Sequence, residues 1–186
     1  MAEYLENGIK VTLPDREHFR IQDLSTYKAL KGWDLSEMDF VWWNLSKDTL
    51  WLIEVEDYFH LSNKDRLPAY LLDRLINKAT DSLMFLSAAW FNSAQGKKIY
   101  AELPVFCQYF PSHPKRLKLV FVLKITEHHL KADLGVLKTR LSSCLRGRVS
   151  LFDLKHITLT DHETAQKMGL PIKILEQPDV LEAGEV

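Results

Sequence analysis

The chain has 186 residues, of which 46% are hydrophobic and 26% are charged, and its net charge at pH 7 is −1. These values predict one soluble globular domain over residues 1–177, with a sizeable core. No apolar run approaches the roughly 20 residues of a membrane-spanning helix, and the acidic start lacks a secretory n-region. Cys107 and Cys144 are too few for a disulfide framework, so we expect free thiols in a cytoplasmic protein that makes no membrane contact.

Positive charge is concentrated in one stretch of the chain. Residues 115–155 contain ten Lys or Arg against three Asp or Glu, a segment charge of +7, so the remainder carries −8. This asymmetry can give one face affinity for a polyanion while another face holds carboxylates for a cation. It is equally compatible with two faces that neutralise each other within the chain or in a homodimer.

Hydrophobic periodicity predicts strands in the first third of the chain and alternating helices and strands later. The strongest helical pattern runs from Leu67 to Phe91, with Pro68 suited to the first turn. Aromatic and β-branched residues at 38–44 and 49–57 flank a polar connection and predict a β-hairpin. Before the hairpin we expect strands at 8–13 and 18–21 around a turn at Pro14-Asp15, and a helix from an Asp23 cap to about Leu30. After the long helix we expect a loop or irregular strand from Pro104 to Pro114 and a strand at 117–125. The last expected elements are a helix from 129 to 145 ending near Gly147, a strand at 156–160, and a helix capped by Asp161 that runs to Met168.

This order of elements predicts an α/β fold of the mixed α+β kind. An antiparallel group followed by alternating strands and helices favours a central mixed sheet with helices on both faces. Residues 178–186 are acidic and poor in apolar side chains, so we expect a disordered tail there.

The second strand of the hairpin ends in acidic residues. Because side chains alternate along a strand, Glu54 and Glu56 share one face, and both faces are apolar until this end is reached. The carboxylates are therefore expected beside a covered region, where an unpaired charge is unfavourable. A turn centred in the polar connection places Asp39 opposite Glu54 and Trp42 opposite Trp51.

Three carboxylates that converge in this way need a compensating cation, because like charges on opposed strand positions repel. One source is a hard divalent ion, since Mg²⁺ is bound by one or two carboxylates together with water and substrate phosphate. The other source is a Lys or Arg from a neighbouring helix. The spacing of the acids leaves both open.

Residues 38–43 (MDFVWW) and 50–58 (LWLIEVEDY) resemble the PD-(D/E)XK nuclease motif, in which an Asp opens one strand and E-x-K lies on the next. The order of elements resembles that family over roughly residues 20–160. The resemblance implies a restriction-endonuclease-like core and phosphodiester hydrolysis of nucleic acid, DNA in preference to RNA, with Mg²⁺ or Mn²⁺. It implies Asp39 and Glu54 as metal ligands, together with the backbone carbonyl of Val55.

Glu56 departs from the pattern, because it stands where the family has its lysine. Either Glu56 accepts a proton or joins the metal, or the basic residue has moved to the following helix, where Lys78 and Arg74 are candidates. The third interpretation is that the catalytic centre has been lost. The alternative function is then a nuclease-like module that binds a protein partner or nucleic acid without cutting it.

Basic residues of the predicted helix after residue 128 are candidates for phosphate contacts. The basic residues near the C-terminal end of this helix lie where the helix dipole favours cations, whatever the function of the protein. Phosphate contacts would give salt-dependent affinity without base readout, and a solvated helix face is the competing interpretation. The candidates are Lys131, Lys138, Arg140, Arg146 and Arg148.

Overall fold

The protein was analysed as a computed structural model that describes residues 1–61, 65–91, 93–108, 116–125, 128–154 and 157–174. Its centre is a five-stranded mixed sheet. The strand order is β3 (His18–Phe19), β4 (Phe40–Asn44), β5 (Thr49–Asp57), β6 (Arg116–Lys124) and β7 (Ile157–Asp161). The pairs β3/β4 and β4/β5 are antiparallel, whereas β5/β6 and β6/β7 are parallel, so the expected mixed sheet is confirmed.

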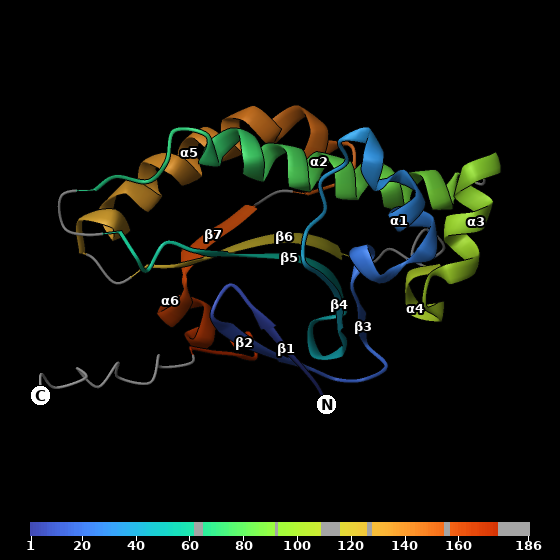
Figure 1. Ribbon diagram of the computed structural model, residues 1–186, viewed down its shortest axis with the longest axis horizontal. Helices are drawn as coiled ribbons and strands as arrows, with labels where there is room; N and C mark the ends of the chain where they lie inside the picture. Colours follow the sequence, from blue (N-terminus) through green and yellow to red (C-terminus); the bar gives the residue numbers. More distant parts are fainter. Residues whose placement is uncertain (62–64, 92, 109–115, 126–127, 155–156, 175–186) are drawn as a thin grey trace, which may run out of the picture.

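The two faces of the central sheet are covered differently. Helices α2 (Leu71–Trp90) and α5 (His128–Ser150) lie together over one face (Figure 1). The other face packs against α6 (His162–Lys167) and a small antiparallel sheet, whose strand order is β1 (Ala2–Glu6), β2 (Ile9–Leu13) and β8 (Ile172–Ile174). Helices on both faces were expected, and the small sheet supplies much of the second layer.

The β4–β5 hairpin has the register that the sequence predicted. Phe40 pairs with Ile53 and Trp42 with Trp51, and the two indole rings meet edge to face with centroids 5.4 Å apart. The connection is a 3₁₀ turn over Leu45–Lys47, in which the Asn44 side chain accepts a hydrogen bond from the Lys47 N–H. This capped turn explains how the hairpin closes without the residues of a primed turn.

Alternation along β5 separates two apolar cores. Leu50 and Leu52 belong to the larger core beneath α2 and α5, whereas Trp51, Ile53 and Val55 belong to the core that faces the small sheet. Because β5 is the middle strand of the sheet, both of its faces are buried almost to the end. Glu54 and Glu56 continue the face of the leucines and therefore point toward α2.

The N-terminal hairpin was not predicted. Asn7 and Gly8 both have positive φ, +49° and +67°, and they join β1 to β2. Asn-Gly with two positive φ angles is the preferred chemistry for a two-residue hairpin turn. Beyond this turn β2 matches the predicted strand, and β8 pairs with its other edge.

The region after α2 is more helical than expected. Helix α3 (Ala94–Glu102) was not predicted, and α4 (Val105–Gln108) replaces the start of the loop or irregular strand assigned from Pro104. The rest of that segment, residues 109–115, lies outside the described residues, as does the predicted tail at 178–186. The α3 start is capped by Ser93, whose hydroxyl accepts from the Gly96 N–H.

Several predicted boundaries were wrong for local reasons. Asp23 does not cap α1 (Ser25–Leu30), because it lies in a 3₁₀ turn and the Glu102 carboxylate accepts from the Ser25 N–H at 2.6 Å instead. The predicted strand 18–21 is limited to β3. Helix α5 continues through Gly147, whose missing Cβ would meet no other atom within 4 Å. Asp161 does cap α6, accepting from the Thr164 N–H at 3.0 Å.

Candidate functional site

Two basic residues of α2 lie over the acidic end of β5. Arg74 and Lys78 are four residues apart, so they share one face of the helix. That face meets the sheet where Glu54 and Glu56 point upward from β5. The sequence named both cations as candidates, and the structure places both at the acids.

Lys78 is the point at which the acids converge. Its ammonium forms an ion pair with Glu54 Oε1 and lies 3.8 Å from Asp39 Oδ1 and 3.8 Å from Glu56 Oε1. Arg74 Nε lies 3.0 Å from the same Glu56 oxygen, in an ionic contact without hydrogen-bond geometry. The neighbouring-helix cation, one of the two sources that the spacing left open, is therefore present.

The three acids are almost completely shielded from solvent. Glu54 is 0% exposed, Glu56 4% and Asp39 6%. The side chain of Lys78 is 14% exposed, and that of Arg74 is 44% exposed. A buried carboxylate is tolerated only when it is paired or protonated, so Lys78 has a structural role whatever else it does.

The Asp39 side chain also forms a hydrogen bond with the backbone near the end of β5. Its Oδ2 accepts a hydrogen bond of 2.8 Å from the Val55 N–H, so Oδ1 is the oxygen that faces Lys78. The Val55 carbonyl accepts from Asn7 Nδ2 at 2.6 Å. The resemblance implies that this carbonyl oxygen binds the metal. The oxygen would then have to bind the metal while it accepts the hydrogen bond from the Asn7 amide.

Sequence reasoning missed two residues beside the acids. Asn7 reaches Val55 from the β1–β2 turn, and the Asn-Gly dipeptide was the signal that would have placed a hairpin there. Tyr58 follows the acidic cluster, and its hydroxyl is buried with no hydrogen-bond partner within the described residues. Burial, and then the charge of Glu56, raise the pKa of Tyr58, so it is a neutral phenol.

Burial and mutual repulsion favour protonated acids. Burial raises the pKa of Asp39 to about 7, against the opposing effect of Lys78. Burial, and then the charge of Asp39, raise the pKa of Glu54 well above its ordinary value. Burial acts to lower the pKa of Lys78, but Glu54 and Asp39 outweigh it and the net shift is upward. Both acids therefore take up protons more readily than exposed carboxylates do, whereas Lys78 holds its proton more tightly than an exposed lysine.

A hard cation at this site would have few protein ligands. Glu54 Oε2 is buried and has no hydrogen-bond partner in the described part of the chain. Two carboxylates plus water match the way proteins hold Mg²⁺. Over the described ranges, no group of three or more His, Cys, Asp or Glu is arranged to hold a metal, so a site built from all three acids is not formed.

The predicted nucleic-acid residues do not surround the acids. Lys131 Nζ is paired with Glu163 Oε2 at 2.9 Å, and the other four are exposed along α5. Arg146 and Arg148 lie some 15 to 17 residues beyond Lys131, roughly 25 Å along the helix. A bound polyanion would have to run along α5 to reach both the basic residues and the acidic site.

Compared with known protein families, with curated proteins and with solved structures, the chain matches none. Among the residues described, no helix is long and apolar enough to cross a membrane. Cys107 is buried and Cys144 is exposed, and both are free thiols, as the sequence predicted.

Proposed function

We propose that this protein is a Mg²⁺-dependent, nuclease-like phosphodiesterase that acts on nucleic acid, DNA in preference to RNA. The observation that carries the proposal is the meeting of Lys78 with Asp39 and Glu54 at the end of β5. These are the groups that the PD-(D/E)XK resemblance requires. The lysine comes from α2 instead of from position 56 on the strand.

Each group has a role that its surroundings allow. When bound, a divalent cation would polarise the phosphodiester and activate water. Asp39 Oδ1 and Glu54 Oε2 are the oxygens that would hold it, because Val55 already occupies the other oxygen of Asp39 and Lys78 that of Glu54. The Lys78 ammonium would stabilise negative charge that develops on the phosphoryl oxygens.

Arg74 gives Glu56 a role different from that of the family lysine. Its guanidinium neutralises Glu56, which reduces repulsion between this carboxylate and an approaching phosphate. Glu56 is then a partner that holds Arg74 near the site. This assignment favours the interpretation in which the basic residue moved to the following helix.

The burial of the acids supports a second candidate function. With Glu54 at 0% exposure and Lys78 already paired to it, the charges compensate each other without a bound ion. A nuclease-like module of this kind would bind nucleic acid or a protein partner without cutting. The basic face of α5 would then carry the contact with nucleic acid.

One experiment separates the two candidates. Supercoiled plasmid, single-stranded DNA and RNA are incubated with the full chain in Mg²⁺, Mn²⁺ or chelator. We expect metal-dependent nicking of DNA, reduced roughly a hundredfold or more by Lys78→Gln or Asp39→Asn. Lys98→Gln, an exposed change on α3, is the matched control and should retain activity. If the Asp39→Asn variant cleaved DNA as fast as the wild type, the cleavage would come from a contaminating nuclease, and the binding module would be favoured.

A further inference from the structure

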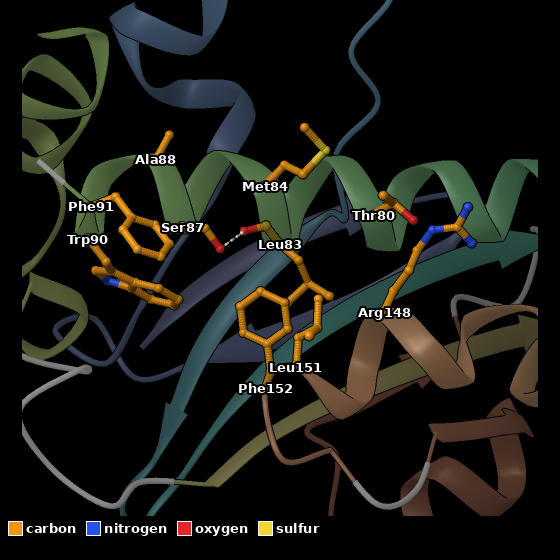
Figure 2. Close-up of a pocket in the computed structure, with 10 residues that line it drawn as sticks. All are labelled: Thr80, Leu83, Met84, Ser87, Ala88, Trp90, Phe91, Arg148, Leu151 and Phe152. Atoms are coloured by element: carbon orange, nitrogen blue, oxygen red, sulfur yellow. Dashed lines mark hydrogen bonds between the residues drawn. The ribbon is translucent and has the colours of Figure 1, made fainter. Parts of the chain in front are cut away.

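A groove of about 880 Å³ lies between the second half of α2 and the end of α5, and it shares no residue with the acidic site (Figure 2). Its lining is predominantly apolar and includes Leu83, Trp90 and Phe152. Three large apolar side chains at the groove are unusually exposed: Met84 at 64%, Phe91 at 84% and Leu151 at 84%. Large exposed apolar side chains gathered at one groove are typical of a binding site.

The groove is polar toward one end. In Figure 2, Thr80 and Arg148 lie toward one end of the view, and Trp90 and Phe91 lie toward the other. The Thr80 hydroxyl oxygen is buried and has no hydrogen-bond partner within the described residues. Because this oxygen has almost no accessible surface, a ligand in the groove does not reach it, and Arg148 is the charged group that lines this end.

Arg148 places a positive charge at the same end. Its Nη1 donates a hydrogen bond of 3.2 Å to the Cys144 carbonyl, and across the described ranges no carboxylate lies within ion-pair distance of it. Residues 134–150 of α5 include four Lys or Arg and no Asp or Glu. The groove therefore joins a long apolar wall to a cationic end.

We propose that this groove binds a single-chain amphiphile with a carboxylate head, a ligand of the fatty-acid class. The carboxylate accepts hydrogen bonds from Arg148, and the chain lies over Leu83 toward Trp90 and Phe91. The volume falls within the range of small-molecule pockets. From Thr80 to Phe91 the helix rises about 16 Å, which suits a long, narrow ligand.

The polar end distinguishes this occupant from an apolar helix or a second copy of the chain. A charge-assisted hydrogen bond to a carboxylate satisfies Arg148. A purely apolar partner surface would bury its guanidinium without an acceptor, which is unfavourable. The proposal does not rest on the proposed nuclease activity.

The test titrates the full chain with monomeric dodecanoate in a calorimeter, with dodecanol as the neutral-headed probe. We expect saturable one-to-one binding of dodecanoate. Arg148→Gln should weaken it about tenfold, because a charge-assisted contact is lost, whereas dodecanol should bind both proteins alike. Arg146→Gln, two residues away and outside the lining, is the matched control and should change nothing.

A second pair of variants tests the apolar wall. Met84→Glu places a charge in the groove at an exposed position and should abolish binding of both probes. Val136→Glu, on α5 and equally exposed at 62% against 64%, should have no effect. Circular dichroism checks that each variant is folded.

Four results would overturn the proposal. They are no saturable binding of dodecanoate, equal effects of Arg148→Gln and Arg146→Gln, binding to anionic vesicles without binding to the monomer, and a dimer in sedimentation that Met84→Glu dissociates. The last would assign the groove to a second copy of the chain.

Discussion

Lys78, in the second turn of α2, forms an ion pair with Glu54, whose side chain is wholly buried near the end of β5. The pair connects α2 to the middle strand of the sheet. A buried ion pair adds little net stability, because the desolvation of both charges offsets their attraction. Removing one partner has a much larger effect, since it leaves the other charge buried and unpaired.

Lys78→Met is therefore expected to destabilise the fold strongly. The free energy of unfolding should fall by about 3–5 kcal/mol, because Glu54 loses its nearest cation. Urea denaturation followed by circular dichroism measures the change. Lys131→Met removes a partly exposed ion pair with Glu163 and is the matched control, with a loss below about 1 kcal/mol. Equal losses for the two variants would show that Lys78 does not compensate a buried charge.

Removing both charges should restore much of the lost stability. The double variant Lys78→Met with Glu54→Met removes the Glu54 charge together with its cation, so it should be more stable than Lys78→Met, although Asp39 still loses its contact with Lys78. A double-mutant cycle over the four proteins gives the coupling energy. If the stability loss of the double variant equals the sum of the losses of the two single variants, Lys78 and Glu54 are not energetically coupled.

Stability should fall as the pH rises across the titration range of Asp39. Burial raises its folded-state pKa to about 7, whereas an unfolded Asp titrates near its ordinary value of 3.8. Between roughly pH 4 and 7 the folded state keeps a proton that the unfolded state has released, so the free energy of unfolding declines through this window. Glu54, whose pKa is also raised by burial, acts in the same direction.

Urea denaturation of the wild type and of Asp39→Asn at several pH values measures this slope. The variant should have a shallower slope, because it removes one of the two titrating groups while keeping a hydrogen-bond acceptor for Val55. An identical slope in both proteins would exclude Asp39 as the source.

The exposed cations of α5 should contribute to DNA affinity without sequence preference. Arg140→Gln should weaken binding equally for unrelated duplexes and lower the slope of log affinity against log salt concentration by about 1. Lys131→Gln should have a smaller effect, because Lys131 is already paired with Glu163. Fluorescence anisotropy over a salt series provides both numbers. If the Arg140→Gln variant kept the wild-type affinity and the wild-type salt slope, α5 would not be part of the DNA interface.

Local chemistry explains why the centre of the fold was predictable. The hairpin register follows from two apolar runs and a short connection, and it correctly placed Trp42 against Trp51. Strand alternation then determined that Glu54 and Glu56 share a face. The four-residue spacing of Arg74 and Lys78 put both on one side of α2, which made them candidates for the same site.

The remaining features depend on contacts between distant parts of the chain. Asn7 meets Val55 across 48 positions, and nothing in either segment indicates that the N-terminal hairpin reaches the acidic site. The start of α1 is satisfied by Glu102, which is 77 positions away from Ser25. The apolar groove arises only when the ends of α2 and α5 come together, so neither helix reveals it alone.

Metal binding by the acids is the most direct test of the proposed site. Calorimetric titration of the full chain with Mn²⁺, near neutral pH and in two buffers of different ionisation enthalpy, measures both affinity and proton release. We predict that wild-type protein binds one Mn²⁺ and releases protons, because Asp39 and Glu54 must ionise to hold it. Asp39→Asn should bind at least tenfold more weakly, roughly the loss of one charged contact. The absence of saturable Mn²⁺ binding to the wild type, or equal binding to the Asp39→Asn variant, would contradict the proposal.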